Sequence, residues 1–176
     1  MWGWLSSGGS GSRPMARVFV SVGSNVDRLR NVRSAVAALR RQFGELLLSR
    51  VYDTEAVGFD GPSFLNLVAG FDTAESVFDV AARLRHIEKE HGRKRNGSRF
   101  APRTLDLDLL LYGDLVLEEG GVCVPRDEIT RFAFVLCPMA EIAPQLNHPV
   151  IGRSFAELWQ GFAQPGQRLS PVEIRL

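Results

Sequence analysis

Hydrophobic positions recur along the chain with two spacings, which predict alternating strands and helices. Apolar residues three and four apart mark one face of a helix, whereas short β-branched or alternating runs are typical of strands. Helices are predicted over residues 29–43 and 77–91, the first ended by Gly44 and the second begun at Ser76 and ended by Gly92. Strands are predicted over residues 17–25, with a break at Gly23, and over residues 46–52, 64–71 and 104–112.

The order of these elements, β-α-β-β-α-β, predicts an α+β protein. It is the ferredoxin-like arrangement, an antiparallel four-stranded sheet with two helices on one face. After Gly113 the chain is expected to be less regular, with one short amphipathic helix over residues 154–162. Residues 1–14 are rich in Gly and Ser and are expected to be a flexible leader or a segment introduced by cloning, with Met15 as the natural start. We therefore expect a single domain over residues 15–176.

Composition narrows the functional classes. A formal charge of +1 argues against a general nucleic-acid binder, and no apolar run is long enough to span a membrane. Cys123 and Cys137 lie far apart, so neither a disulfide framework nor a zinc site is predicted, and a reduced, cytoplasmic compartment is expected. His86 and His148 have no evident partners and are expected on the surface.

The strongest chemical signal is a basic segment that runs into an acidic strand. Asp106 and Asp108 share one face of the predicted strand, about 6.6 Å apart, with leucines on the opposite face. Cations that clamp phosphate beside carboxylates that hold magnesium predict phosphoryl chemistry on a nucleotide. From the residues alone, an edge strand with two solvated aspartates is an equal alternative. The preceding residues 93–103 hold five basic side chains and no acidic one: Arg93, Lys94, Arg95, Arg99 and Arg103.

Within this loop, Arg93, Arg95 and Arg103 are the candidates for bidentate phosphate contacts, whereas Lys94 and Arg99 are expected to be solvated surface residues.

Six short motifs, in one order and at one spacing, resemble the 6-hydroxymethyl-7,8-dihydropterin pyrophosphokinase family of folate biosynthesis. The resemblance covers nearly the whole chain from Met15. The motifs are VGSN at residues 22–25, YDTEAVG at 52–58, FLNLV at 64–68, IEKEHGRKR at 87–95, RFAPRTLDLDLLLYG at 99–113 and AFVLCPMAEIAP at 133–144.

The resemblance implies transfer of the β,γ-pyrophosphoryl group of ATP to the hydroxymethyl group of a reduced pterin, with release of AMP. Asp106 and Asp108 would bind two Mg²⁺ ions, and Asp108 is the nearest candidate for a base. The implied phosphate-binding and catalytic arginines are Arg93, Arg95 and Arg103, and the implied nucleotide-binding residues also include Glu88, Phe100 and Arg126.

On the pterin side, the resemblance implies that Phe64 and Phe134 stack on the two ring faces. Asn66 would bind the pyrimidine edge, with Thr54 and the backbone of Val57 completing the contacts. Taken without the resemblance, core packing is the favoured interpretation of the two phenylalanines.

The chain departs from the family pattern at the ATP tail. Arg126 replaces a histidine, Phe132 replaces an arginine, with Arg131 displaced by one position, and Gly121 replaces another arginine. These changes predict weakened or rearranged binding of the triphosphate. Two alternatives are therefore kept: a degenerate member that binds pterin or nucleotide without turnover, and a ferredoxin-like binding module. The partners expected are ATP and a reduced pterin, without nucleic acid or membrane, and a monomer is expected.

Overall fold

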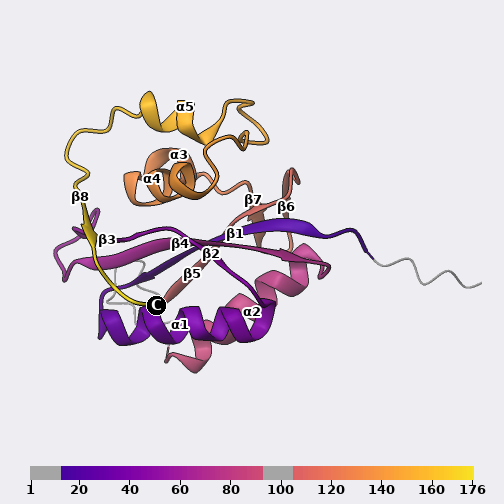
Figure 1. The fold of residues 1–176 in the computed structure, drawn as a ribbon, viewed down its shortest axis with the longest axis horizontal. Coiled ribbons are helices and arrows are strands. Elements are labelled where there is room, and N and C mark those ends of the chain that lie inside the picture. Colours follow the sequence, from indigo (N-terminus) through magenta and orange to yellow (C-terminus); the bar gives the residue numbers. More distant parts are fainter. Residues whose placement is uncertain (1–12, 93–104) are drawn as a thin grey trace, which may run out of the picture.

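The computed structural model of the protein describes residues 13–92 and 105–176, so residues 1–12 of the expected leader lie outside it. The described chain forms a mixed α/β fold in which helices cover both faces of an antiparallel sheet (Figure 1). The strands are β1 (Ala16–Ser24), β2 (Leu47–Leu48), β3 (Val51–Thr54), β4 (Phe64–Thr73), β5 (Asp106–Tyr112), β6 (Leu117–Glu119), β7 (Val122–Val124) and β8 (Leu169–Val172). The helices are α1 (Arg28–Phe43), α2 (Val77–Glu90), α3 (Glu128–Arg131), α4 (Ala133–Ile142) and α5 (Phe155–Gln160).

The main sheet has the strand order β5-β1-β4-β3-β8, with β2 also paired to β4. The predicted break at Gly23 is wrong: β1 continues through this residue, which pairs with Asn66 on β4 and with Asp106 on β5. The register therefore places two predicted site residues, Asn66 and Asp106, on the two strands that flank Gly23. The two predicted helices are confirmed as α1 and α2, and the Ser76 hydroxyl accepts a hydrogen bond from the Asp79 N–H at 3.1 Å at the start of α2.

The strand predicted over residues 46–52 is divided into β2 and β3. Ser49, between them, is buried, and its hydroxyl accepts a hydrogen bond from the Val68 N–H at 2.9 Å. The same hydroxyl donates to the Arg50 carbonyl at 2.8 Å. The Ser49 hydroxyl thus accepts the hydrogen bond that a backbone carbonyl would accept in a regular sheet, and the strand is interrupted at this residue.

Each face of the sheet has its own hydrophobic core. Below the sheet in Figure 1, α1 and α2 pack against buried side chains such as Val20 and Leu107. Above it, α4 packs against β4 on the other face and α5 packs on α4, and Phe19, Val68 and Met139 are buried there.

The chain after Gly113 is more regular than predicted, because it forms α4, which packs against β4 on the second face of the sheet. Its sequence AFVLCPMAEI is apolar at nearly every position and contains Pro138, so it lacks the periodicity that marks an amphipathic helix. The short helix expected over residues 154–162 is present as α5. Its start is a capping box in which Ser154 and Glu157 each bond the other's backbone N–H.

His148 differs from the expectation of a surface position. It is only 6% exposed, and its Nδ1 accepts hydrogen bonds from the N–H groups of Val150 and Ile151 at 3.2 Å. Burial lowers the pKa of His148, which favours the neutral ring that these bonds require. His86 is exposed, as expected, and lies 3.6 Å from Glu90.

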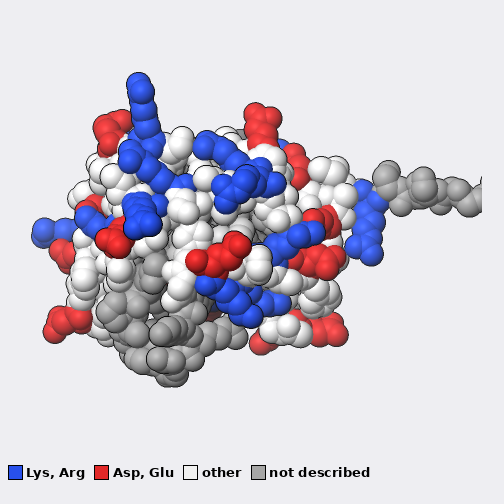
Figure 2. Space-filling model, turned by 90° about the horizontal axis from the view of Figure 1, so that it is seen from below, with Lys and Arg blue, Asp and Glu red and all other residues white. Residues whose placement is uncertain are grey.

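The α1–α2 side carries basic and acidic side chains interspersed over its described part, rather than one continuous sign of charge (Figure 2). Among residues 13–92 and 105–176, every helix is too short or too polar to cross a membrane.

Candidate active site

A cavity of about 500 Å³ lies between the sheet and the segment that carries α3 and α4. Strands β1, β3, β4 and β5 contribute to its floor, and residues from Arg126 to Val135 contribute to its opposite wall. Eight predicted site residues from both binding regions line this one cavity: Thr54, Val57, Phe64, Asn66, Asp106, Asp108, Arg126 and Phe134.

Asp106 and Asp108 point to the cavity side of β5, as the alternation predicts. Leu105, Leu107 and Leu109, between and beside them, are at most 7% exposed and enter the core under α1 and α2. β5 is an edge strand, as the alternative interpretation assumed. The two carboxylates nevertheless line a cavity rather than an open edge.

Arg126 stands between two carboxylates at this end of the cavity. Its Nη2 lies 3.5 Å from Asp108 Oδ1, and its Nε lies 3.1 Å from Glu128 Oε1. Burial by itself lowers the pKa of Arg126, but the charges of Asp108 and Glu128 outweigh it and raise the pKa above its ordinary value. The guanidinium is therefore charged, and one of its two carboxylate neighbours is a predicted metal ligand.

Asn66 is held in place by its two neighbours on the sheet. Its Nδ2 donates to Thr54 Oγ1 at 2.6 Å, and both residues are buried. A Cβ atom at Gly23 would lie only 2.6 Å from Asn66 Oδ1, so a larger residue there would displace the amide. The position of this buried amide thus depends on glycine in β1.

The aromatic residues of the cavity form two separate groups. Phe64 lies edge-on to Phe59, with ring centroids 6.3 Å apart. Phe134 stacks on Phe132 at 5.1 Å, and the Arg131 guanidinium lies 5.4 Å from the Phe132 ring. Both predicted stacking residues line the cavity while partly exposed, which favours a binding surface over plain core packing.

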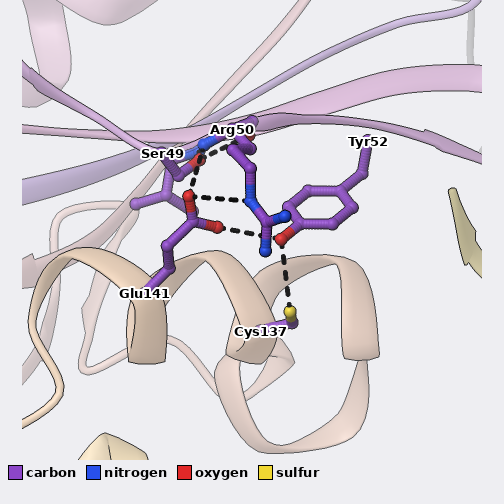
Figure 3. A network of polar contacts seen from close by, with 6 residues as sticks. Ser49, Arg50, Tyr52, Cys137 and Glu141 are labelled. Atoms are coloured by element: carbon purple, nitrogen blue, oxygen red, sulfur yellow. Dashed lines mark hydrogen bonds and ion pairs between the residues drawn. The ribbon is translucent and has the colours of Figure 1, made fainter. Parts of the chain in front are cut away.

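A polar network fixes α4, which carries Phe134, to β3 (Figure 3). Glu141 Oε2 accepts from the Tyr52 hydroxyl at 2.8 Å, and Oε1 accepts from the Arg50 N–H at 2.8 Å. Cys137 donates to the same hydroxyl at 3.6 Å. Burial, and then the bonds to Cys137 and Glu141, raise the pKa of Tyr52, so the phenol stays protonated and can donate to the carboxylate.

The other predicted site residues lie elsewhere. Arg93, Arg95, Phe100 and Arg103 fall outside the described residues. Glu88 is buried, and its Oε1 accepts from the Leu107 N–H at 2.9 Å, between the two aspartates of β5. It lines a second hollow of about 210 Å³, which shares Asp108 and Arg126 with the main cavity.

Several lining residues were not predicted. Glu128 and Ser21 were not singled out, and Phe132 was considered only as a departure from the family pattern. The alternation on β1 places Ser21 and Gly23 on one face, so the position of Ser21 was readable. Glu128 had no sequence signal, because its role depends on its distance to Arg126.

The carboxylates of the cavity fit a divalent cation that is bound jointly by the protein and by a phosphate-bearing ligand. Asp106 and Asp108 supply hard carboxylate oxygens, the type that Mg²⁺ prefers. In the described residues, no group of three or more His, Cys, Asp or Glu side chains is placed to bind a metal ion. Phosphate oxygens and water would have to complete the coordination.

Comparison with known proteins agrees with this geometry. The profile of 7,8-dihydro-6-hydroxymethylpterin-pyrophosphokinase (HPPK) matches residues 19–144. The chain belongs to the HPPK family. The 2-amino-4-hydroxy-6-hydroxymethyldihydropteridine pyrophosphokinase of Pseudomonas aeruginosa is 39% identical to it over 146 residues, covering 81% of this chain and 89% of that protein. The Bacillus subtilis protein of the same name is 36% identical over 133 residues, covering 73% and 79%.

The fold is also similar to that of solved structures. A crystal structure of Plasmodium falciparum HPPK-DHPS matches with a TM-score of 0.68 at 12% identity, over 86% of this chain and 45% of that one. This chain therefore spans less than half of that longer protein, and the likeness concerns the fold alone.

Proposed function

We propose that this protein transfers the β,γ-pyrophosphoryl group of ATP to 6-hydroxymethyl-7,8-dihydropterin, giving the pterin diphosphate and AMP in folate biosynthesis. Membership of the HPPK family and the names of its relatives support this reaction. The observation that carries the proposal is the convergence of the Asp106–Asp108 pair, the Asn66–Thr54 pair and two partly exposed phenylalanines on one cavity.

The pterin would lie between Phe64 and Phe134, which line the cavity from β4 and α4. Its pyrimidine edge would meet the Asn66 amide, which Thr54 already orients, and the backbone of Val57. Because the amide is positioned before binding, little ordering is needed when the ring enters.

The triphosphate would lie beside β5, held by Arg93, Arg95 and Arg103 and flanked by Glu88, Phe100 and Arg126. Arginine suits this role because its guanidinium makes paired bonds to phosphate oxygens. When bound, two Mg²⁺ ions would neutralise phosphate charge and lower the pKa of the attacking hydroxyl. Asp106 and Asp108 are the residues that would hold them.

In the reaction, the hydroxymethyl oxygen forms a bond to the β-phosphorus of ATP. The bond from that phosphorus to the oxygen bridging the α and β positions breaks, and AMP leaves with this oxygen. Asp108 is the carboxylate proposed to take the hydroxyl proton. In a loose phosphoryl transition state, positioning and charge stabilisation supply most of the rate, so the base contributes little.

The proposal includes a finer description of the molecule. The order β5-β1-β4-β3 with α1 and α2 on one face would be a ferredoxin-like core, extended by β8 and by the α3–α5 segment. The single domain would comprise residues 15–176 and act as a cytoplasmic monomer on its two small substrates.

The test is a product assay with ATP, Mg²⁺ and 6-hydroxymethyl-7,8-dihydropterin, with the nucleotides separated chromatographically. AMP and pterin diphosphate in equal amounts are expected. ADP would indicate transfer of a single phosphoryl group and would contradict the proposal. Tight binding of both ligands without product would favour the degenerate family member, for which the Arg126 and Phe132 departures are the specific observation.

A further inference from the structure

The backbone of Arg126 is hydrogen-bonded to β5, and its side chain lies where the main cavity meets the second hollow. Its N–H donates to the Leu110 carbonyl of β5 at 2.9 Å, which ties the residue to the strand that carries Asp108. Its side chain borders both the main cavity and the second hollow. Motion of the guanidinium alone can therefore change which of the two spaces receives its charge.

The two carboxylate contacts of Arg126 use different nitrogens. Nε lies 3.1 Å from Glu128, whereas Nη2 lies 3.5 Å from Asp108. All three side chains are about one third exposed, at 35% for Arg126 and Asp108 and 30% for Glu128. Because the contacts are separate, loss of the one to Asp108 leaves the one to Glu128 intact.

The described part of the cavity wall is acidic overall. Glu55, Asp106, Asp108 and Glu128 line it, against Arg126 and Arg131. Arg131 already pairs with Asp127 at 3.0 Å. Arg126 is thus the described cation that contacts Asp108 of the predicted metal-binding pair.

We propose that Arg126 is an internal counter-ion for Asp108 that competes with the divalent cation and contacts the nucleotide phosphates once the cation has bound. Glu128, whose Oε1 lies 3.1 Å from Nε, keeps the guanidinium close by charge attraction during this exchange. The inference rests on the proposed function, because it assumes a divalent cation and a triphosphate beside β5. It assigns a positioning role to Glu128 and a specificity role to Arg126, one of the three residues at which the sequence is expected to depart from the family pattern.

The experiment measures binding without turnover. Mn²⁺ affinity in the absence of nucleotide is followed by the electron paramagnetic resonance signal of free Mn²⁺. Affinity for α,β-methylene-ATP with Mg²⁺ is followed by calorimetry, since this analogue blocks the bond that breaks. In Arg126→Gln, Mn²⁺ should bind about tenfold more tightly, because a competing charge beside Asp108 is gone. The analogue should bind about tenfold more weakly, because a phosphate contact is lost.

Two further variants sharpen the test. Glu128→Gln removes the other partner of Arg126, so the guanidinium should hold Asp108 more firmly and Mn²⁺ should bind roughly threefold more weakly. Arg131→Gln removes the same charge from the same wall without touching Asp108, and Mn²⁺ affinity should change less than about twofold. Circular dichroism of each variant checks the fold, and Glu128→Gln carries the test if Arg126→Gln does not fold.

Unchanged or weakened Mn²⁺ binding in a folded Arg126→Gln protein would overturn the inference, as would unchanged affinity for the analogue. Tighter Mn²⁺ binding in Glu128→Gln would overturn the role of Glu128. Failure of the proposed function is a separate result: it appears as absence of AMP formation by the unaltered protein, whatever the Mn²⁺ affinities are.

Discussion

Glu141 and Arg126 each join two segments of the chain, but their surroundings differ. Both oxygens of Glu141 accept short hydrogen bonds, at 2.8 Å from the Tyr52 hydroxyl and from the Arg50 N–H, and Tyr52 is 3% exposed. Arg126 has looser contacts, at 3.1 and 3.5 Å, between side chains that water reaches.

The difference separates structural from functional polar groups. Hydrogen bonds from a buried donor such as the Tyr52 hydroxyl stabilise one arrangement, and removal of the acceptor is costly even where, as here, the Glu141 and Arg50 side chains are 26% and 61% exposed. Partly hydrated ion pairs contribute little to stability, but their charges remain accessible to ligands. Substitutions around Glu141 should therefore change stability first, and substitutions around Asp108 should change turnover first.

The largest effect is expected for Asp108→Ala. Loss of a predicted metal ligand should reduce kcat by about a thousandfold or more. The free energy of unfolding should change by less than about 1 kcal/mol, since both side chains of the ion pair to Arg126 are 35% exposed. The measurement is AMP formation together with urea unfolding. Asp114→Ala is the matched control, because Asp114 is exposed just after β5 and lies outside the cavity lining. Retained activity in Asp108→Ala would contradict the metal assignment.

Glu141→Gln should produce the opposite pattern. Its carbonyl oxygen can still accept one of the two bonds, but its amide nitrogen cannot accept the other, so the protein should lose about 1–3 kcal/mol of stability. The KM for the pterin should rise, because α4 carries Phe134, while kcat should stay nearly unchanged. Glu173→Gln changes an exposed carboxylate nearby and serves as the control. A large loss of kcat at unchanged stability would contradict the proposed difference between the contacts of Glu141 and those of Arg126.

Gly23→Ala tests whether crowding alone affects the cavity. The added methyl group would meet Asn66 Oδ1 at 2.6 Å, so the KM for the pterin should rise about tenfold. Gly70→Ala is matched to it, because its methyl group would meet the Phe19 ring at 2.9 Å, away from the cavity lining. Both variants should lose about 1–3 kcal/mol of stability. An equal rise in KM for both would show that Asn66 has no special part in binding.

The smallest effect is a pH dependence of stability that comes from His148, which contacts neither Glu141 nor Arg126. The pKa of His148 is lowered by burial in the folded protein, so the unfolded chain binds its proton more readily. The resulting stability is fully present above the unfolded pKa of about 6.5 and is lost as the pH falls through the lower folded pKa. Urea unfolding at several pH values should show this loss, and His148→Gln should reduce it. An identical pH profile in both proteins would contradict the assignment.

Local patterns explain which parts of this molecule were predictable. The alternation of Asp106 and Asp108 with buried leucines determines their common face. This follows from the two-residue period of a strand.

Long-range contacts explain the rest. Tyr52 and Glu141 are separated by 89 positions, and no local periodicity relates them. α4 is apolar at nearly every position, so its role as the cover of a second sheet face could not be read from an amphipathic pattern. The burial of His148 depends in the same way on where the chain returns after α4. The corresponding residues were predicted as an irregular extension or a surface histidine for this reason.

The bond from the Leu107 N–H to Glu88 has a consequence for the protein in concentrated solution. β5 is an outer strand, and an outer strand with open N–H groups invites a foreign strand to add to it. The buried carboxylate of Glu88 takes the N–H between the two aspartates, so a second chain finds no donor there. The Glu88 side chain, which is hydrogen-bonded to β5, thereby also disfavours pairing of β5 with a second chain.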